Sequence, residues 1–509
     1  MKRSTWIFLV AIIALLPIMI FRDYTPDNEL RYLSIADEAL RNGTFFTFSH
    51  QGVPYADKPP LYLWIVMACR LAFGCYPMVV LSMFSLVPAL VIAGVMNSMV
   101  GRVRNCDSIK EQSTVMLLSC GLFLGTAIVV RMDMLMCMFI VLAVKSFWNM
   151  YTSRRFSGRD TWLFPIYLFL ALFTKGPLGL IIPMAGVAVF LLSVRRPKML
   201  GKCFGLKTWA VLLLLSGAWF AAVYLEGSSD YLNNLLFHQT VDRAVSAFHH
   251  QRPFWHYAVS LWYCMQPWAF LLVGVTVATV CVRTVKSEVQ RLFLSIAVTT
   301  FVVLSCVSSK LDVYMIPAYP FLVYYAVSNI SAFNDNKWVR LSVAVPSVIF
   351  AVSPIAVWFM SDYQLLGNFS GSVLLYAASS LLCLTGIAVL SALYRRRDVG
   401  SAVCFMGGGL ALTVFVCGWF VGSLNPYLGY GDVCKLAASQ SGHSVLVDKN
   451  ISEAADMDVY LGKRMSLVDA DSVSRNVQDK AFVLITDTAN ISKFPKRTAE
   501  RCGRLCVIR

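Results

Sequence analysis

The sequence predicts an all-α polytopic membrane protein with about 13 transmembrane helices and a small C-terminal α/β domain. Mean hydropathy is +0.65 and 14% of the 509 residues are charged, which is typical of a chain that crosses a bilayer repeatedly. Apolar runs that can span, with tilt, a hydrocarbon core of about 30 Å recur as far as residue 422. Short β-like runs replace them from residue 424 onward.

The apolar runs also predict an orientation. They lie at residues 6–21, 77–99, 113–130, 132–151, 162–174, 177–194, 208–225, 258–282, 291–308, 314–332, 340–360, 372–393 and 401–422. Lysine and arginine gather in alternate connecting loops, which places those loops in the cytoplasm. We therefore expect the N-terminus in the cytoplasm and, because the number of spans is odd, the C-terminus on the opposite side.

The net charge of +16 follows from these basic loops, so we expect no nucleic-acid partner. The apolar N-terminal run resembles a signal peptide, but no small-residue cleavage site follows, so we expect a retained first span. Most of the 15 cysteines lie in apolar runs, where cysteine behaves as a small hydrophobic residue. Cys502 and Cys506 are the close polar pair that could form a disulfide in an oxidising compartment.

The polar segment 22–76 follows the first span directly and is predicted to form the first external loop. Asp27 and Glu29 come just after Pro26, at the start of a predicted helix. Asp27 could cap that helix or serve as a functional carboxylate. Since residues two apart do not share a helix face, at most one of the two should point into a given cleft. A second short apolar helix is predicted at residues 61–73.

Three further ionisable residues lie on the predicted external side of the membrane. Asp133 is a functional candidate at the lip of a membrane cavity, or it pairs with Arg131. Lys58 lies between Asp57 and two prolines, which fix the backbone and hold the ammonium where it suits a phosphate. Lys175 precedes Gly176 and Pro177, and it either meets a lipid headgroup or extends to the interface.

The predicted external loop 226–257 has an unusual density of histidine. It holds four of the six histidines in the chain. Its candidate binding residues are His238, Arg243, His249 and His250. These could bind a divalent metal together with a carboxylate such as Asp57, or they could bind phosphate. Phosphate is favoured because the loop has no HxxH or HExxH spacing. Another external turn carries Lys310, Asp312 and Tyr314.

Together, these motifs resemble those of the polyprenyl-phosphate-sugar-dependent GT-C glycosyltransferases, the family of the bacterial lipid A aminoarabinose transferases and relatives of the protein O-mannosyltransferases. The similarity runs in order over about residues 1–420. It rests on PDNELRY, GVPYADKPPLYLW, RMDMLM, FTKGPLGL, the stretch from His238 to Trp255, and SSKLDVYMIPAYP. Two positions depart from the family pattern: Asn28 stands where an aspartate is expected, and Asp57 replaces a glutamate.

The resemblance implies an inverting transfer of a sugar, such as an aminoarabinose-type pentose, from a polyprenyl-phosphate donor to lipid A at the periplasmic face of the bacterial inner membrane. It implies that Lys58 and Arg243 bind the carrier phosphate with help from Lys175 and Lys310. Tyr55 and Tyr314 lie in the same donor-binding motifs. Asp133 and either Asp27 or Glu29 would position the acceptor. The resemblance leaves two possibilities for Asp57 and the loop histidines: they bind a divalent metal, or they bind phosphate.

Alternative functions use the same features differently. A protein or glycan O-glycosyltransferase would share the donor site. A lipid-linked-sugar transporter should carry charges within its spans and often repeated halves, and the sequence shows neither. A scaffold would leave the Lys58 and Asp133 motifs unexplained. We expect residues 1–423 to form the catalytic membrane domain and residues 424–509 a periplasmic domain for structure or acceptor docking, in a monomer.

Overall fold

A computed structural model of the chain describes residues 3–101, 106–153, 158–227, 229–235, 251–282, 287–333, 336–360, 373–396, 398–439, 444–462, 465–476 and 482–509. Its contacts divide the chain into two compact units. Unit 1 comprises residues 1–16, 57–59 and 82–417, and unit 2 comprises residues 17–56, 60–81 and 418–509. Each unit is described by itself.

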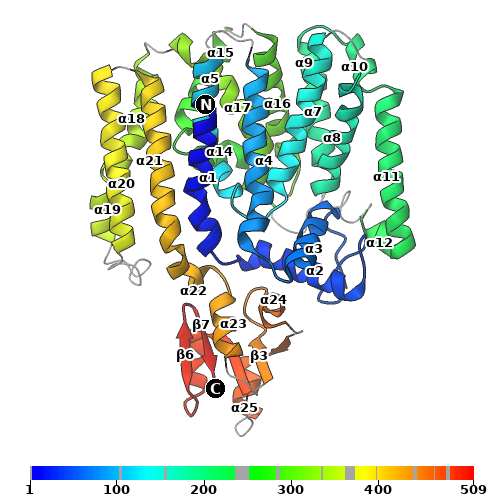
Figure 1. The fold of residues 1–509 in the computed structure, drawn as a ribbon, viewed down its shortest axis with the longest axis vertical. Coiled ribbons are helices and arrows are strands. Elements are labelled where there is room, and N and C mark those ends of the chain that lie inside the picture. Colours follow the sequence, from blue (N-terminus) through cyan, green and yellow to red (C-terminus); the bar gives the residue numbers. More distant parts are fainter. Residues whose placement is uncertain are drawn as a thin grey trace. The chain divides into compact units, whose positions relative to one another are not determined.

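Unit 1 is built of helices, three of which continue into unit 2 (Figure 1). Its longer helices are α1 (Arg3–Phe21), α4 (Met78–Met99), α5 (Cys106–Leu118), α7 (Asp133–Ser153), α8 (Asp160–Lys175), α9 (Leu178–Ser193), α11 (Leu206–Glu226), α15 (Ala269–Cys281), α16 (Glu288–Cys306), α17 (Tyr319–Ile330), α18 (Lys337–Ala351), α20 (Val373–Ser391) and α21 (Val399–Phe420). Shorter helices are α6 (Gly121–Thr126), α10 (Lys198–Cys203), α12 (Ser229–Asn233), α14 (His256–Cys264), η3 (Asp312–Ala318), η4 (Ser331–Phe333), α19 (Ser353–Met360) and η5 (Ala392–Arg396). Every predicted apolar run thus contains helix.

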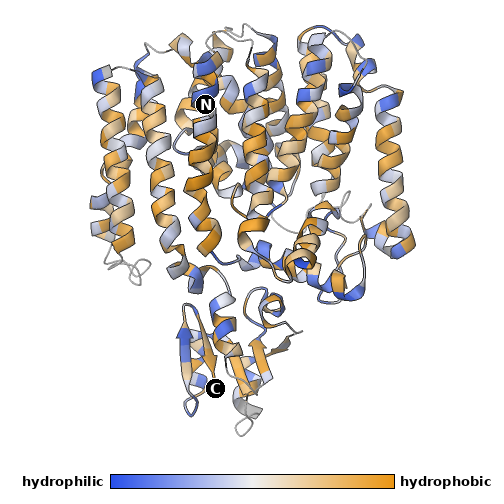
Figure 2. Ribbon diagram, viewed as in Figure 1, coloured by the Kyte–Doolittle hydropathy of each residue, from blue (hydrophilic) through white to orange (hydrophobic). Residues whose placement is uncertain are grey.

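Length and composition support a membrane protein. Within the described residues, 6 helices are long and apolar enough to cross a membrane, or up to 8 if each bent helix pair counts as one span. Hydrophobic residues run along these helices and hydrophilic residues gather at their ends (Figure 2). In α11 the share of the apolar window that is buried is 22%, against 67% in α7. The helix α11 therefore turns most of its apolar surface outward, as lipid contact requires.

Two predicted spans are broken rather than continuous. The run 113–130 is interrupted between α5 and α6, and the run 258–282 is interrupted between α14 and α15, where Pro267 cannot donate a helical hydrogen bond. The two breaks meet: the Gly121 amide donates to the Gln266 carbonyl at 2.9 Å, and the Trp268 indole donates to Ser119 Oγ at 3.0 Å. Non-helical backbone within a membrane span is tolerated where the protein itself supplies the hydrogen-bond partners, as these two breaks do for each other.

The helices α7, α8 and α9 form a closely packed group that carries several candidate residues. Met136, Ile140, Ala171 and Ile182 form a buried cluster between them. A Cβ atom on Gly179 would lie 2.3 Å from the carbonyl oxygen of Ala171, so glycine lets α9 approach α8 at this point.

In unit 2, residues 22–56 and 60–77 form two helices and a hairpin. The segment η1 (Pro26–Leu30) leads into α2 (Arg31–Asn42), which packs on α3 (Leu61–Phe73). Short strands β1 (Ser49–His50) and β2 (Val53–Pro54) pair antiparallel. The predicted helix at 61–73 is confirmed, whereas the hairpin lies in a stretch expected to be loop.

The C-terminal part of unit 2 is a five-stranded mixed sheet. Its strands are β3 (Ser444–Asp448), β4 (Ser466–Val468), β5 (Phe482–Asp487), β6 (Ala499–Cys502) and β7 (Leu505–Ile508), in the order β4-β3-β5-β7-β6. The helical segments beside it are α22 (Asn425–Leu428), α23 (Gly431–Ala438), η7 (Ala454–Met457), α24 (Asp458–Leu461) and α25 (Ala470–Asn476), with η6 (Val421–Leu424) before them and η8 (Thr488–Lys493) after β5. The α/β expectation is confirmed. β4 and β6 were not predicted.

The register of β6 and β7 is incompatible with the disulfide that Cys502 and Cys506 could have formed. Cys502 pairs with Leu505, and Cys506 pairs with Arg501. Since paired residues share a face and neighbours alternate, the two cysteines lie on opposite faces of the sheet. Cys506 instead lies in the buried core with Phe482 and Leu484.

Candidate active site

A buried carboxylate in unit 1 lies between two cations. The Asp133 side chain is 1% exposed, and Arg131 Nε donates to its Oδ2 at 3.1 Å. Lys175 Nζ forms an ion pair with the other oxygen, Oδ1. The Lys175 ammonium also lies 4.2 Å from the ring centroid of Tyr314. Two residues predicted from separate motifs, Asp133 and Lys175, are thus in direct contact, and Tyr314 joins them.

Local sequence explains how these groups meet. Asp133 begins α7, where the positive end of the helix dipole favours a carboxylate. Lys175 ends α8, where the negative end favours an ammonium. The next residue, Gly176, has φ of 103° and ψ of −161°, a conformation that a side chain would strain. Gly176 therefore turns the chain sharply, and Pro177 follows as the N-cap of α9.

Lys58 belongs to unit 1 and lies near this cluster. Its ammonium pairs with Asp57 Oδ2 at 2.8 Å, and the two side chains are 16% and 19% exposed. The Lys58 charge is near enough to act on Lys175. Around the cluster, Arg131, Lys175 and Lys58 supply three positive charges and Asp133 and Asp57 two negative charges, which leaves one net positive charge.

Lys310 has a different setting from Lys58. It is 4% exposed, donates to the carbonyl of Arg252 at 3.2 Å, and also bonds the carbonyl of Val307. A bridge between Gln251 and Ser309 lies beside it. Lys310 therefore fastens the chain after residue 250 to the turn before η3.

Asp312, the other carboxylate of that turn, contacts two aromatic side chains. His256 Nε2 lies 2.9 Å from Asp312 Oδ1, and the Tyr263 hydroxyl lies 3.1 Å from both Asp312 oxygens. These contacts hold both ends of α14 against Asp312, the first residue of η3.

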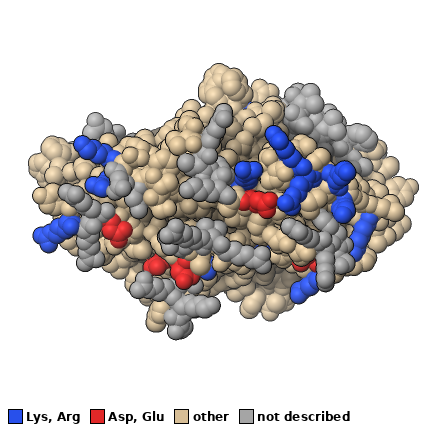
Figure 3. All heavy atoms as spheres, turned by 90° about the horizontal axis from the view of Figure 1, so that it is seen from above, with Lys and Arg blue, Asp and Glu red and all other residues tan. Residues whose placement is uncertain are grey.

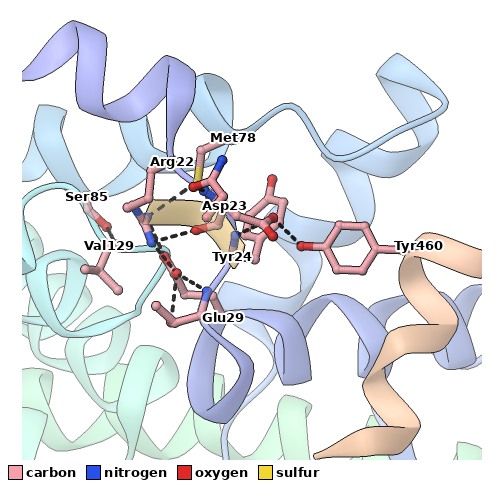
Figure 4. A network of polar contacts seen from close by, with 10 residues as sticks. Arg22, Asp23, Tyr24, Glu29, Met78, Ser85, Val129 and Tyr460 are labelled. Atoms are coloured by element: carbon pink, nitrogen blue, oxygen red, sulfur yellow. Dashed lines mark hydrogen bonds and ion pairs between the residues drawn. The ribbon is translucent and has the colours of Figure 1, made fainter. Parts of the chain in front are cut away.

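The first-loop carboxylates lie in unit 2 and differ from each other. Glu29 is fully buried, and Arg22 Nη2 donates to its Oε1 at 2.7 Å (Figure 4). The amide and hydroxyl of Thr25 both donate to Glu29 Oε2 at 2.8 Å. Asp27 is exposed and accepts a hydrogen bond from Ser452 at 3.2 Å. It does not cap the helix, because Thr25 is the N-cap of η1 and no side-chain cap bond forms there.

Several predicted residues have other placements. Tyr55 is half-buried in unit 2, where its ring meets that of His50 edge-to-face at 6.5 Å. His238, Arg243, His249 and His250 lie outside the described residues.

Arg22 and Asp23 were not predicted as functional residues. Both follow the first apolar run and resembled a simple flank of it. Asp23 accepts hydrogen bonds from the Gly431 amide at 2.7 Å and from the Tyr460 hydroxyl. A charged pair so close to a span was the available signal for both residues.

The chain is similar to known glycosyltransferases. No family model matches it. An uncharacterized protein of Aquifex aeolicus is 24% identical over 444 residues, covering 82% of this chain and 86% of that protein. The undecaprenyl phosphate-alpha-4-amino-4-deoxy-L-arabinose arabinosyl transferase of Erwinia tasmaniensis is 24% identical over 431 residues, covering 82% of this chain and 76% of that enzyme.

A solved structure decides the fold. The crystal structure of ArnT from Cupriavidus metallidurans bound to undecaprenyl phosphate superposes with a TM-score of 0.77, covering 99% of this chain and 98% of that chain at 16% identity. This chain has the ArnT fold. The apo structure of ArnT matches with a TM-score of 0.74. The GT-C fold that the motifs implied is therefore confirmed.

Proposed function

We propose that this protein is an inverting glycosyltransferase that moves a sugar, such as an aminoarabinose-type pentose, from a polyprenyl-phosphate carrier to lipid A. The ArnT fold supports this proposal, and so do relatives named as arabinosyl transferases that use undecaprenyl phosphate-linked aminoarabinose. The observation that carries it is the buried Asp133 between Arg131 and Lys175, with Lys58 nearby.

The cluster suits a reaction in which a phosphate leaves. The bond between the sugar and the carrier phosphate breaks, and the phosphate gains negative charge as it departs. Fixed ammonium and guanidinium groups stabilise such charge best where water is excluded. In this proposal Lys58 and Lys175 bind the leaving phosphate, with Arg243 from the external loop. Asp133 holds Lys175 and Arg131 in place until the carrier arrives.

The chemistry of the acceptor determines whether the site needs a general base. A lipid A phosphate is already an anionic nucleophile, so no residue has to remove a proton from it. Asp133 and one first-loop carboxylate would then orient the acceptor. The exposed Asp27 is better suited than Glu29, whose oxygens are bonded to Arg22 and Thr25. A hydroxyl acceptor would instead need a carboxylate as general base.

Lys310 and the tyrosines take supporting roles in this proposal. Lys310 would position the external loop through the carbonyls that it binds, and not contact phosphate directly. Tyr314 would hold the Lys175 ammonium against its ring. Tyr55 would act within the first-loop hairpin.

We also propose about 13 spans in a bacterial inner membrane, with the N-terminus cytoplasmic and the C-terminal sheet periplasmic. The distribution of charge supports this orientation. Lysine and arginine side chains are spread over the face shown in Figure 3, and acidic side chains are fewer there. The positive-inside bias would make that face cytoplasmic.

Two substitutions test the site. Lys58→Ala and Asp133→Asn should each lower transfer by about a hundredfold or more, as the loss of a charge-stabilising group does, while the protein still inserts and folds. Asp107→Asn is a matched control, because the Asp107 side chain is 95% exposed. Near-normal transfer by both variants would exclude this site.

Mass spectrometry of lipids from a deletion strain tests the substrates. The proposal predicts that the unused polyprenyl-phosphate sugar accumulates and that lipid A loses one sugar mass. If the carrier accumulates while lipid A is unchanged, the acceptor is a protein or another glycan. If neither lipid changes although the parent strain expresses the protein, the donor assignment is wrong.

A further inference from the structure

Unit 2 contains a compact group of metal-ligating side chains apart from the cluster around Asp133. It consists of His50 at the end of β1, Glu453 just before η7, and Asp456 within η7. One potential ligand atom from each of the three lies within 4.8 Å of the others. Two segments about 400 residues apart in the sequence therefore bring an imidazole and two carboxylates to one point.

The hairpin that carries His50 is held in place by its own contacts. Glu38 of α2 accepts hydrogen bonds from Ser49 Oγ and the Gln51 amide at 2.7 Å each, and from the Gly52 amide at 2.9 Å. The Gln51 side chain reaches across to the Ala455 carbonyl at 3.3 Å. The imidazole is thus presented to η7 by a rigid turn, as a preformed site requires.

One ligand of the group is buried with an incomplete set of partners. Asp456 is 0% exposed. Its Oδ1 lies 2.6 Å from His50 Nε2, while its Oδ2 has no hydrogen-bond partner. A buried carboxylate is costly unless paired and hydrogen-bonded. The unpartnered oxygen belongs to the carboxylate whose other oxygen contacts His50, so a cation bound at this group could satisfy it.

The net charge of the group and its neighbour Arg31 favours binding of a cation. Glu453 is paired with Arg31, which neutralises one of the two carboxylates. With a neutral imidazole, the net charge of His50, Glu453, Asp456 and Arg31 is one negative. Each carboxylate has two oxygens, so Glu453 can bond Arg31 through one oxygen and a metal through the other.

We propose that His50, Glu453 and Asp456 bind a divalent first-row metal ion, with zinc as the best match. One imidazole nitrogen and two carboxylate oxygens are zinc ligands, with a fourth position left for water. This site is distinct from the one considered for Asp57 and the histidines of the external loop. Bound there, the ion fastens the first-loop hairpin to the C-terminal part of unit 2.

Binding would change the protonation of His50. The imidazole nitrogen that faces Asp456 must be unprotonated to hold the metal, so a proton bound there leaves for solvent or the ring changes tautomer. The metal then replaces the bond between His50 and Asp456 with two bonds to itself. No redox step is involved.

Metal content tests the proposal directly. Full-length protein in detergent is stripped with EDTA, incubated with zinc chloride, passed through gel filtration and measured by plasma mass spectrometry. The wild-type protein should hold one more equivalent of zinc than His50→Ala or Asp456→Asn. His256→Ala and the double variant His249→Ala/His250→Ala should keep that equivalent. Equal zinc content in wild-type, His50→Ala and Asp456→Asn proteins would overturn the proposal.

Thermal unfolding gives a second readout that does not depend on transfer activity. Zinc should raise the unfolding midpoint of the wild-type protein by several degrees, and this rise should be lost in His50→Ala. If Asp456→Asn does not fold because the residue is buried, His50→Gln replaces it, since the His50 side chain is 21% exposed. An equal zinc-dependent rise in wild-type and His50→Gln proteins would also overturn the proposal.

Discussion

Individual buried carboxylates in this chain serve different purposes, and their partners distinguish them. Asp133 pairs with two cations, one of which, Lys175, we propose to bind the carrier phosphate, whereas Glu29 is enclosed by Arg22 and Thr25. Asp456 keeps an oxygen without a partner. The position of the carboxylate in the sequence is a weaker guide to its role than the number of its oxygens already bonded.

For Glu29, the structure predicts a loss of stability. Glu29→Gln would remove the negative charge that pairs with the Arg22 guanidinium, whose side chain is 7% exposed. Removing one partner of a buried ion pair lowers the free energy of unfolding by about 3–5 kcal/mol. The unfolding midpoint should fall sharply, while the folded fraction keeps its transfer activity. Asp27→Asn is the contrasting variant, and it should unfold like wild type. Glu29→Gln protein that is stable but inactive would assign Glu29 to the reaction.

Asp458 predicts a dependence of stability on pH. Burial raises the pKa of this carboxyl, and the neighbouring Asp456 charge adds to the rise, against the lowering effects of Ser34 and Arg41. A carboxyl with a raised folded-state pKa contributes stability below its unfolded pKa and loses it as pH rises through the folded pKa.

Asp458→Asn should therefore raise the unfolding midpoint at neutral pH, by about 2–4 °C per kcal/mol. The difference from wild type should shrink toward about pH 4, where the unfolded carboxyl also protonates. Thermal scans at both pH values measure this. Asp471→Asn serves as the control, because the Asp471 side chain is 52% exposed. A constant difference across pH would contradict the raised pKa.

At the scale of elements, the turn between α8 and α9 places Lys175. Gly179→Ala would push a Cβ atom to 2.3 Å from the Ala171 carbonyl oxygen, so the two helices would have to separate. Overpacking of this kind costs about 1–3 kcal/mol, and the displaced turn should also lower transfer. Gly94→Ala in α4 meets nothing within 4 Å and should be harmless. Equal midpoints for the two variants would argue against this contact.

The elements that the sequence predicted well are those set by local pattern. Apolar runs gave the helices, and the helix at 61–73 and strands β3, β5 and β7 lie where alternation and composition indicated. The breaks between α5 and α6 and between α14 and α15 were not predicted. Each break is stabilised by the other through Gly121 and Gln266, and a contact between distant segments leaves no periodic signal.

In the candidate site, too, individual residues were predicted from local sequence, whereas their contacts were not. Asp133, Lys175 and Lys58 were predicted because each interrupts an apolar or proline-containing stretch. The contact between Asp133 and Lys175, and the role of Lys310 as a backbone fastener, depend on the packing of η3 against its neighbours. Arg22 and Asp23 resembled ordinary flanking charges, and their partners Glu29, Gly431 and Tyr460 gave no local sign.

At the scale of the whole molecule, unit 2 joins the first loop to the end of the chain. Asp23 bonds Gly431 and Tyr460, Arg31 bonds Glu453, and Arg41 lies 3.5 Å from Asp458. Residues 17–56 and 418–509 therefore share one compact unit. We therefore expect the C-terminal segment to help hold the first loop in shape.

The bond between Tyr460 and Asp23 tests this coupling. Burial and the Asp23 carboxylate raise the pKa of Tyr460 well above its usual range, so the phenol stays protonated and donates. A hydrogen bond to a charged group contributes about 1.5–3 kcal/mol. Tyr460→Phe should therefore speed amide exchange in peptides covering residues 23–31 by about tenfold or more, because a tenfold change corresponds to about 1.4 kcal/mol.

Tyr376→Phe in α20 of unit 1 is the matched control, and it should leave exchange in those peptides unchanged. If Tyr460→Phe speeds exchange only in residues 425–460, the first loop holds its shape without the C-terminal segment. Faster exchange in both segments would show that the loop and the sheet open together. Mutations in the C-terminal sheet would then lower transfer by loosening the first-loop residues, without touching a substrate.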